Sequence, residues 1–446
     1  MSTSLSTPVT EWTPPLAPQL ADALVPRVPE SINETGLSAG LIEQIILKLL
    51  YFRGEVAGRD IALGMGLRFS VIEELLETLK RNQLLQVKRS LGVGTISSQF
   101  CLTEAGRVYA RDHLETNQYV GPAPVPLLQY SYMSRRQRPA AGWLTKENLV
   151  QAYRRIVITP EILSQIGPAV SSGNSFLIYG KPGNGKTYLA EALANVDRSC
   201  IYMPYAIESQ GMIVQVYDPV YHQIVQDTEP PSIFNDLAFD GRWFKCRRPF
   251  IATGGELSLE MLDLSYNAVS KIYEAPFQLK ANNGIYLIDD FGRQKASPTE
   301  VLNRWIVPME RRIDYLTFRT GGKMTVPFES FLVFSTNLNP ENLGDEAFLR
   351  RIQYKMLMRS PEPEEFANIF VSFCESRELP CNRAVVERYI DRWYNQTGRP
   401  FRRCHPRDVI SHAIDIIQFE RLPFELTDEL LDRAFESNFI STIEEN

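Results

Sequence analysis

The sequence predicts an α/β fold built around a parallel sheet. An apolar strand at 176–179 runs into a glycine-rich turn and a helix, and a second apolar strand, at 284–288, ends in Asp289 and Asp290. Continuously apolar runs of this length are typical of parallel strands that are buried on both faces. From Pro361 onward the pattern becomes helical, with one apolar face formed by Phe366, Ile369, Phe370 and Phe373. We therefore expect a sheet domain followed by an all-helical domain.

Composition excludes several classes of protein. The 446 residues are 44% hydrophobic and 22% charged, with 47 basic and 53 acidic side chains and a net charge of −6, which argues against binding nucleic acid by overall charge. The six cysteines form no C-x-x-C pair, and the four histidines show no ligand spacing, so we expect reduced thiols and no Cys/His metal site. No basic-then-apolar leader or long apolar run occurs, which predicts a soluble, cytoplasmic protein without a membrane segment.

Two segments are predicted to lack regular structure. Residues 1–36 are rich in Pro, Ser and Thr, and we expect a disordered tail. Residues 119–149 are expected to form a linker, because three prolines (Pro122, Pro124 and Pro126) precede an arginine cluster (Arg135, Arg136 and Arg138).

Between these segments, residues 37–118 are predicted to form a compact domain of three helices and a β-wing. Ser70 and Glu73 have the spacing of a capping box, and a turn at 91–94 is expected to join the wing strands. This order of elements resembles a winged-helix domain. DNA binding is one interpretation, but the helix after Arg68 carries Glu73, Glu74 and Glu77, whereas phosphate contact favours a basic excess. Docking to a protein is the other interpretation, and we favour it.

The glycine-rich turn has the P-loop pattern: Gly180, four residues, then Gly185, Lys186 and Thr187. Backbone N–H groups in such a turn, together with the start of the next helix, cradle phosphate oxygens. Lys186 is expected to reach the β- and γ-phosphates of ATP, and the Thr187 hydroxyl to bind Mg²⁺. The positions expected to contact the nucleotide are Gly180, Lys181, Pro182, Gly183, Asn184, Gly185, Lys186, Thr187 and Tyr188.

The two carboxylates at the end of strand 284–288 are expected to lie beside the P-loop, because parallel strands end at one edge of the sheet. Asp289 is predicted to hold Mg²⁺ and Asp290 to orient the attacking water. The alternative is a buried strand that simply ends in a pair of capping aspartates.

The remaining strands are predicted from shorter patterns. Cys200–Met203 is expected to be the second strand of the parallel sheet, and Met212–Tyr217 to form a hairpin with Tyr221–Val225. A helix over Thr299–Arg312 leads to a hairpin at 313–328, and a buried strand over Phe331–Ser335 ends at Asn337. The last strand is expected at Tyr354–Met358, after the paired arginines Arg350 and Arg351.

Taken together, these motifs and their order resemble the AAA+ ATPase superfamily over about residues 150–435. The phrase APFQLKANNGIYLIDDFGR and the hairpin before the Asn337 strand are similar to its MoxR-like and magnesium-chelatase-like branch. The resemblance implies an AAA+ α/β domain at 150–360, with a five-stranded parallel sheet in the order 5-1-4-3-2, and a helical lid at 361–446.

The resemblance also implies roles for individual residues. Asn337 corresponds to sensor 1, and Arg350 or Arg351 to an arginine finger that acts on a neighbouring subunit; we favour Arg351. Arg407, in His405-Pro-Arg-Asp408, corresponds to sensor 2, the alternative being a capping Arg–Asp pair at a helix start. In the family, the strand that ends in the metal-binding aspartate (the Walker B motif) usually continues with a glutamate. Here that glutamate is replaced by Asp290, whose side chain is shorter by one methylene, so we expect slower hydrolysis.

An arginine finger that acts on a neighbouring subunit implies a homo-oligomer, and the family resemblance suggests a hexameric ring. We expect ATP hydrolysis to be coupled to chaperone-like remodelling of a protein or nucleoprotein partner, a protein client being preferred. The alternative is a regulator that binds DNA through residues 37–118, with ATP controlling assembly. A small-molecule phosphotransferase is disfavoured by the arginine pair and the lid.

Overall fold

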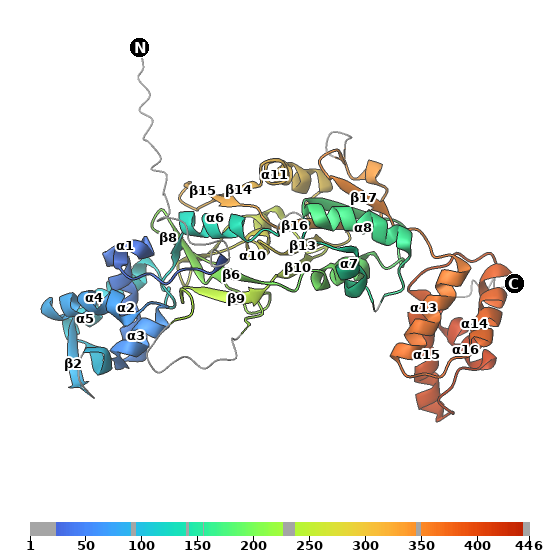
Figure 1. Cartoon of the computed structure of the whole chain (residues 1–446), viewed down its shortest axis with the longest axis horizontal. Helices are drawn as coiled ribbons and strands as arrows, with labels where there is room; N and C mark the ends of the chain where they lie inside the picture. Colours follow the sequence, from blue (N-terminus) through green and yellow to red (C-terminus); the bar gives the residue numbers. More distant parts are fainter. Residues whose placement is uncertain are drawn as a thin grey trace, which may run out of the picture.

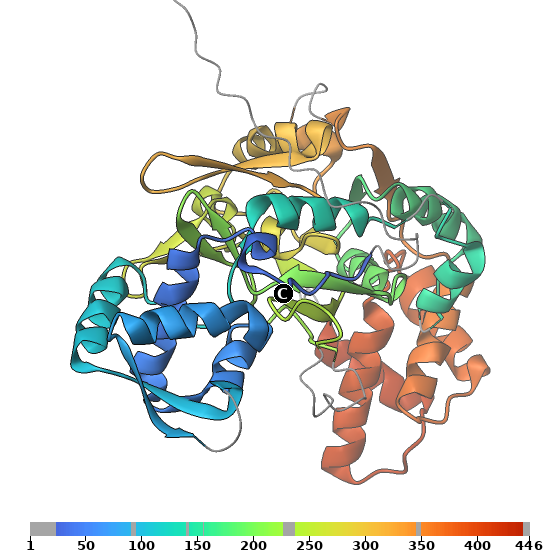
Figure 2. The same cartoon turned by 60° about the vertical axis from the view of Figure 1, so that its left-hand side comes forward.

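The computed structural model describes residues 24–90, 95–139, 142–154, 156–225, 237–344 and 349–439. An N-terminal unit of helices and strands and a C-terminal helical unit lie toward opposite ends of the long axis, with a body of strands and helices between them (Figure 1). A second view shows both units on the same side of that body (Figure 2). Among the described residues, no helix is both long enough and apolar enough to cross a membrane. The expected tail at 1–23 and the turn at 91–94 lie outside the described residues.

The body is organised by a five-stranded, all-parallel sheet in the order β10-β13-β16-β5-β17. Counted along the chain, this is the predicted order 5-1-4-3-2. The central strands β5, β13 and β16 are almost wholly buried, as their continuous apolar sequences require. The strand bounds are Ser175–Tyr179 (β5), Phe250–Thr253 (β10), Ile285–Ile288 (β13), Phe331–Thr336 (β16) and Tyr354–Leu357 (β17).

The second strand of this sheet is β10, and the assignment of Cys200–Met203 to that position was wrong. That segment belongs to β6 (Cys200–Pro204), which pairs antiparallel with β9 (Trp243–Arg247) outside the parallel sheet. The physical reason is its backbone pairing: all five residues of β6 are in antiparallel register with β9, so their hydrogen bonds are made outside the parallel sheet.

Helices cover both faces of the parallel sheet. On one face α7 (Lys146–Ala152), α8 (Pro160–Ser172) and α9 (Lys186–Ala192) pack against alternate residues of β5, such as Phe176 and Ile178. On the other face α10 (Phe277–Lys280) and α11 (Pro298–Arg311) pack around Trp305, which is fully buried. A capping box formed by Ser297 and Glu300 begins α11. The hairpin expected at 313–328 is confirmed as β14 (Ile313–Thr317) and β15 (Lys323–Pro327).

The predicted hairpin between Met212–Tyr217 and Tyr221–Val225 was wrong. Instead, β8 (Met212–Gln215) pairs with the preceding β7 (Ala206–Ser209). The two-residue turn Gln210-Gly211 has positive φ at both positions, which matches the twist of a tight hairpin. The other strands of this mixed sheet are β4 (Val125–Pro126), β11 (Ser265–Asn267) and β12 (Ile272–Glu274), in the order β11-β12-β8-β7-β4.

The N-terminal unit has the predicted order of helices and strands. A three-stranded antiparallel sheet, β1-β3-β2, packs with the helices around one apolar core. The capping box predicted at Ser70 is absent: the helix starts at Phe69, and Glu73 accepts a hydrogen bond from Thr95. The elements are α2 (Ala39–Arg53), β1 (Val56–Ala57), α3 (Gly58–Gly64), α4 (Phe69–Arg81), β2 (Leu85–Ser90), β3 (Ser98–Leu102) and α5 (Glu104–Thr116).

The segments expected to be irregular are partly ordered. Within the expected tail, α1 (Ile32–Thr35) is capped by Ser31, and within the expected linker, α6 (Leu127–Arg136) buries Tyr130 to 1% exposure. Tyr130 packs in the core beneath the mixed sheet, where its hydroxyl accepts a hydrogen bond from Asn282 at 2.6 Å. This part of the expected linker therefore packs into the body.

The N-terminal unit is attached to the body by buried polar contacts. Arg242 and Asp240 form an ion pair that is 2% exposed on both sides, and the Arg242 guanidinium also donates to the Thr35 carbonyl at 2.8 Å. The backbones of Gly66 and Gly241 touch, since a Cβ on Gly66 would lie 2.3 Å from the Gly241 carbonyl carbon. A buried charge is retained only where it is paired and hydrogen-bonded, so this attachment is specific.

The C-terminal part is helical, as predicted. Its core is formed by buried aromatic and aliphatic side chains from all of its helices. Tyr394, in a π-helical turn at Asp391–Asn395, stacks on Phe401 with ring centroids 4.8 Å apart. The helices are α13 (Pro363–Ser376), α14 (Arg383–Ile390), α15 (His405–Glu420) and α16 (Asp428–Asn438).

Candidate nucleotide site

The loop between β5 and α9 folds tightly against the end of β17. A Cβ on Gly180, whose φ is +144°, would lie 2.4 Å from the carbonyl oxygen of Met358. Only glycine fits at that position, because both the conformation and the close approach exclude a side chain. Asn184 is 1% exposed and donates to the same Met358 carbonyl at 3.3 Å. The glycine pattern read from the sequence therefore corresponds to a constrained loop at the carboxyl edge of the sheet.

The Lys186 ammonium is held in the mouth of this loop. It donates to the backbone carbonyls of Gly180 and Lys181, both at 3.0 Å, and to Oδ1 of Asn337 at 2.6 Å. Burial lowers the pKa of Lys186, while the charges of Asp290 and Asp289 act to raise it. The cation is thus fixed at the loop by neutral oxygens, which leaves its charge available to an anion.

Thr187 and Asp289 come together as predicted. The Thr187 hydroxyl lies 3.0 and 2.9 Å from the two carboxylate oxygens of Asp289. Asp289 is placed by the parallel pairing of β13, since its N–H donates to the Thr253 carbonyl of β10 at 2.8 Å. A hydroxyl and a carboxylate are the oxygen ligands that Mg²⁺ prefers.

Asp290 is joined to Lys186 through Asn337. Nδ2 of Asn337 donates to Oδ1 of Asp290 at 2.6 Å, while Oδ1 of the same amide accepts from Lys186. Asp290 has a φ of +49°, a left-handed conformation uncommon for a residue other than glycine. Such conformations are retained where the surroundings fix them, often at functional sites. Three adjacent strands, β5, β13 and β16, therefore bring the three predicted side chains into one hydrogen-bonded row.

Gln294 supports this turn and was not predicted. Its amide donates to the carbonyls of Asp289 and Asp290, at 2.9 and 3.2 Å, and its Oε1 accepts from the Gly292 N–H at 2.7 Å. The amide therefore holds the turn from inside. No sequence motif marks Gln294, because the interaction depends on how the chain folds back after β13.

Arg407 pairs with a neighbouring carboxylate in this structure. Its side chain is 64% exposed and pairs with the adjacent Asp408, which corresponds to the alternative interpretation of this motif. The segment just before it lies on the P-loop: the Cys404 N–H donates to the Gly183 carbonyl at 2.9 Å. The charge of Arg402 contributes to lowering the pKa of Lys186. Sequence reasoning missed Arg402, although Arg399, Arg402 and Arg403 form a cluster that could have drawn attention.

Arg351 lies at the opposite edge of the sheet from the P-loop. Its carbonyl accepts a hydrogen bond from Ser175, the first residue of β5, and its Nε lies 2.7 Å from Oε1 of Glu310. Because β5 rises about 3.3 Å per residue, its two ends are roughly 15 Å apart, so Arg351 does not meet the P-loop of its own chain. Arg350 is exposed.

Comparisons with known proteins give distant likenesses. Residues 362–437 match a family described as a domain of unknown function (DUF8689), and no curated protein matches the chain. The chain is similar to NtrX from Brucella abortus, with 14% identity and a TM-score of 0.39 over 67% of this chain and 60% of NtrX. It is also similar to RuvB from Thermotoga maritima, a Holliday junction branch migration motor, with 13% identity and a TM-score of 0.35 over 68% of this chain and 72% of RuvB.

The chain thus spans about three fifths of the length of that NtrX chain. Another NtrX structure, in complex with ATP, matches with 12% identity and a TM-score of 0.38 over 75% of this chain and 64% of NtrX. Likenesses at this level carry no argument about activity. The case for a nucleotide site depends on the geometry of the P-loop and its neighbours.

That geometry fits a magnesium–triphosphate group. The loop is a glycine cradle with a buried cation, and a hydroxyl–carboxylate pair lies next to it. Among the described residues, no group of three or more His, Cys, Asp or Glu side chains is arranged to hold a metal. A magnesium ion at Thr187 and Asp289 would therefore take its remaining ligands from phosphates and water, which is how Mg²⁺ is commonly bound.

Proposed function

We propose that the chain is a Mg²⁺-dependent ATP hydrolase of the AAA+ kind. The observation that carries the proposal is the row formed by Lys186, Asn337 and Asp290, with the Thr187–Asp289 pair beside it. All five side chains lie at the carboxyl edge of a parallel sheet, where α/β proteins bind ligands. A buried strand that merely ended in a capping aspartate pair would not require the link to the P-loop lysine.

Each residue then has a distinct part. Bound Mg²⁺ would supply charge that stabilises the phosphates as the terminal phosphoryl group is transferred to water. Lys186 binds the β- and γ-phosphates, and Thr187 and Asp289 orient the metal. Asp290 holds the attacking water through a hydrogen bond, and Asn337 fixes the Asp290 carboxylate. Asp290 is shorter than the usual glutamate, and we expect a slow enzyme.

Arg351 would act on a second copy of the chain. Its position at the amino edge, remote from its own P-loop, supports a role in trans, and this in turn favours a homo-oligomer such as a hexameric ring. We further propose that hydrolysis remodels a protein client. The N-terminal unit is attached to the body through Arg242 and Gly66. Movement of the body would therefore be transmitted to a client protein bound to the N-terminal unit.

DNA binding by the N-terminal unit is the less favoured alternative. The exposed residues of α4 include Glu73 and Glu74 as well as Lys80 and Arg81, so the helix presents no basic excess to phosphate. The resemblance of residues 37–118 to a winged helix stays a proposal, and duplex binding that weakens steeply with salt would favour the DNA alternative.

The metal site tests the proposal. Asp289→Asn is expected to weaken the Mg²⁺-dependent part of ATP binding by about tenfold, because it replaces a charged metal ligand by a neutral amide. The measurement is titration of ATP with and without Mg²⁺, with the exposed Asp112→Asn as the control that removes an equal charge. Equal Mg²⁺ enhancement in Asp289→Asn and the wild type would place the metal elsewhere.

A second measurement distinguishes the roles of Arg402 and Arg407. Since Arg402 lies near Lys186 and Arg407 is exposed, we propose Arg402 as the arginine that binds the γ-phosphate in its own subunit. Arg402→Ala is expected to weaken ATP binding by about tenfold while leaving ADP binding unchanged, as for loss of one charged hydrogen bond. Arg407→Ala should change neither by more than about twofold. If Arg407→Ala weakens ATP binding about tenfold and Arg402→Ala does not, Arg407 is the arginine that binds the γ-phosphate.

A further inference from the structure

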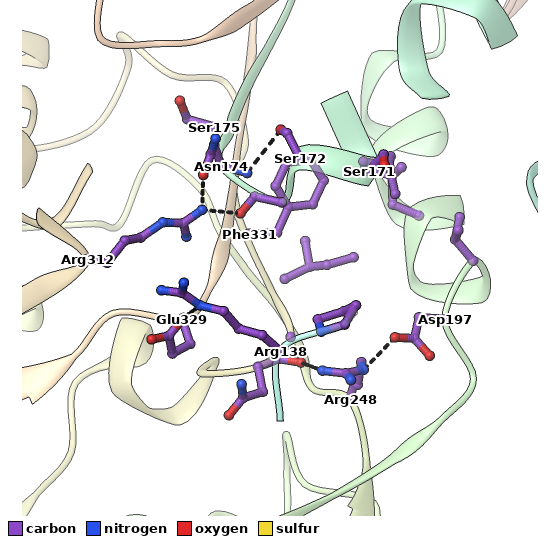
Figure 3. Close-up of a pocket in the computed structure, with 18 of the residues that line it drawn as sticks. Arg138, Ser171, Ser172, Asn174, Ser175, Asp197, Arg248, Arg312, Glu329 and Phe331 are labelled. Carbon is purple, nitrogen blue, oxygen red and sulfur yellow. Dashed lines mark hydrogen bonds and ion pairs between the residues drawn. The ribbon is translucent and has the colours of Figure 1, made fainter. Parts of the chain in front are cut away.

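A cavity of about 500 Å³ lies at the amino edge of the parallel sheet, the edge opposite the P-loop. Figure 3 shows side chains that line it. Its walls include the residues at which parallel strands begin or which immediately precede them, such as Ser175, Pro249, Ile285 and Phe331. This volume is within the range of small-molecule sites. Arg351 lines this cavity too, but the proposed hydrolytic mechanism places no ligand in it.

The lining carries more positive than negative charge. Four arginines and three carboxylates line the cavity, and three of the arginines form ion pairs: Arg138 with Glu329, Arg248 with Asp197, and Arg351 with Glu310. The fourth arginine, Arg312, forms no ion pair with any residue that the structure describes. It donates instead to neutral oxygens, the Gly173 carbonyl at 2.8 Å and the side chain of Asn174.

Arg312 and Arg138 lie close enough to influence each other. Figure 3 shows both guanidinium groups on the same side of the cavity, with Glu329 beside Arg138. Burial lowers the pKa of Arg312 and the positive charge of Arg138 lowers it further, while the negative charge of Glu329 acts to raise it. Glu329 is 1% exposed and uses one oxygen for Arg138, while its other oxygen is buried without a hydrogen-bond partner. Glu329 hydrogen-bonds only to Arg138 among the two arginines, so two neighbouring cations share the charge of one carboxylate.

We propose that this cavity binds the phosphate group of a small molecule, with Arg312 and Arg138 as its ligands. The planar guanidinium presents several donors that match phosphate oxygens, and a doubly charged anion would relieve the repulsion between the two cations. The apolar part of the lining, which includes Trp143, Val170 and Phe331, would cover the rest of the ligand. This mixture of apolar walls and a few convergent charges is usual for small-molecule sites.

A purely structural role accounts for only part of this arrangement. The hydrogen bonds of Arg312 to Gly173 and Asn174 fasten the end of α8, but these acceptors are neutral, and the nearby Glu329 forms its ion pair with Arg138. The adjacent Arg311 is exposed and does not line the cavity. Arg311→Gln is therefore a matched control: it removes the same charge one residue away.

The probe is inorganic pyrophosphate, titrated calorimetrically into the full-length Lys186→Ala variant so that the P-loop does not contribute. Saturable binding is expected, weakened at least tenfold when Arg312→Gln is added and changed less than twofold when Arg311→Gln is added. The result does not depend on ATP hydrolysis, so its failure is distinguishable from failure of the proposed function. Absence of binding to Lys186→Ala, or equal affinity with Arg312→Gln, overturns the proposal.

Thermal unfolding of each variant shows whether Arg312→Gln has folded. If it has not, Arg312→Lys is used in its place, because lysine keeps the positive charge but lacks the planar guanidinium that matches phosphate oxygens. Affinity below that of the Arg311→Gln control is the expected result for Arg312→Lys. Affinity equal to the control overturns the assignment of Arg312 as a phosphate ligand.

Discussion

Lys186→Ala is expected to abolish ATP binding or to weaken it by about 10²-fold or more, because it removes the buried cation at the P-loop. The loss would exceed that of one contact. The Lys186 ammonium donates hydrogen bonds to three oxygens: the carbonyls of Gly180 and Lys181, and Oδ1 of Asn337. Without it, these acceptors would face the phosphate anion with no donor. Unpaired acceptors beside phosphate oxygens are repulsive, and this adds to the lost attraction.

Equilibrium titration with ATP measures this effect. The exposed Lys146→Ala of α7 serves as the control, since it changes net charge equally and lies outside the loop. Comparable affinity for ATP in Lys186→Ala and in Lys146→Ala would show that the P-loop is not the nucleotide site.

Arg351→Ala is expected to leave nucleotide binding intact and to reduce turnover by about 10³-fold or more, as in other arginine-finger systems. The reason is positional: Arg351 lies at the amino edge of the sheet, and an arginine there can reach a γ-phosphate only in another subunit. Its present partner, Glu310, would have to release it when subunits assemble. Exposed Arg311→Ala, at the end of the same helix as Glu310, is the control, and its turnover should stay near that of the wild type.

Mixing two inactive variants tests the role in trans. Arg351→Ala subunits retain an intact P-loop, and Lys186→Ala subunits retain an intact arginine, so a mixture should regain part of the activity. Rescue requires that the two kinds of subunit share an assembly. Full activity of Arg351→Ala alone, or a native protein that turns over ATP as a monomer, would exclude the ring mechanism.

The sequence predicted those parts of the site that depend on local patterns. Lys186 and Thr187 follow from the spacing of glycines, and Asp289 and Asp290 from a strand that ends in acids. Asn337 was found because parallel strands end at a common edge, and the structure places it between Lys186 and Asp290. In each case a short run of residues fixes both the element and the place of the side chain.

The parts that were missed depend on contacts between distant segments. Strand β10 and the segment Cys200–Met203 both have four residues, and β10 follows a long insertion, so no local pattern shows which of them joins the parallel sheet. Arg402 reaches the P-loop only because the helical domain folds back onto Gly183. Likewise, Arg138, Arg312 and Glu329 are separated by up to 191 residues and meet only in the folded chain. No local signal carries such information.

Single-turnover phosphate release from the Mg²⁺–ATP complex is the most direct measurement. Wild-type protein and Asp290→Asn are compared with the protein in excess, so that all of the ATP is bound, and exposed Asp112→Asn is the control. We predict that Asp290→Asn binds Mg²⁺–ATP as tightly as the wild type but releases phosphate about 10²-fold more slowly or not at all, because the amide accepts the water's hydrogen bond weakly. Phosphate release by Asp290→Asn at the wild-type rate, or no release by the wild type itself, would contradict an ATP hydrolase built on Lys186, Asn337 and Asp290.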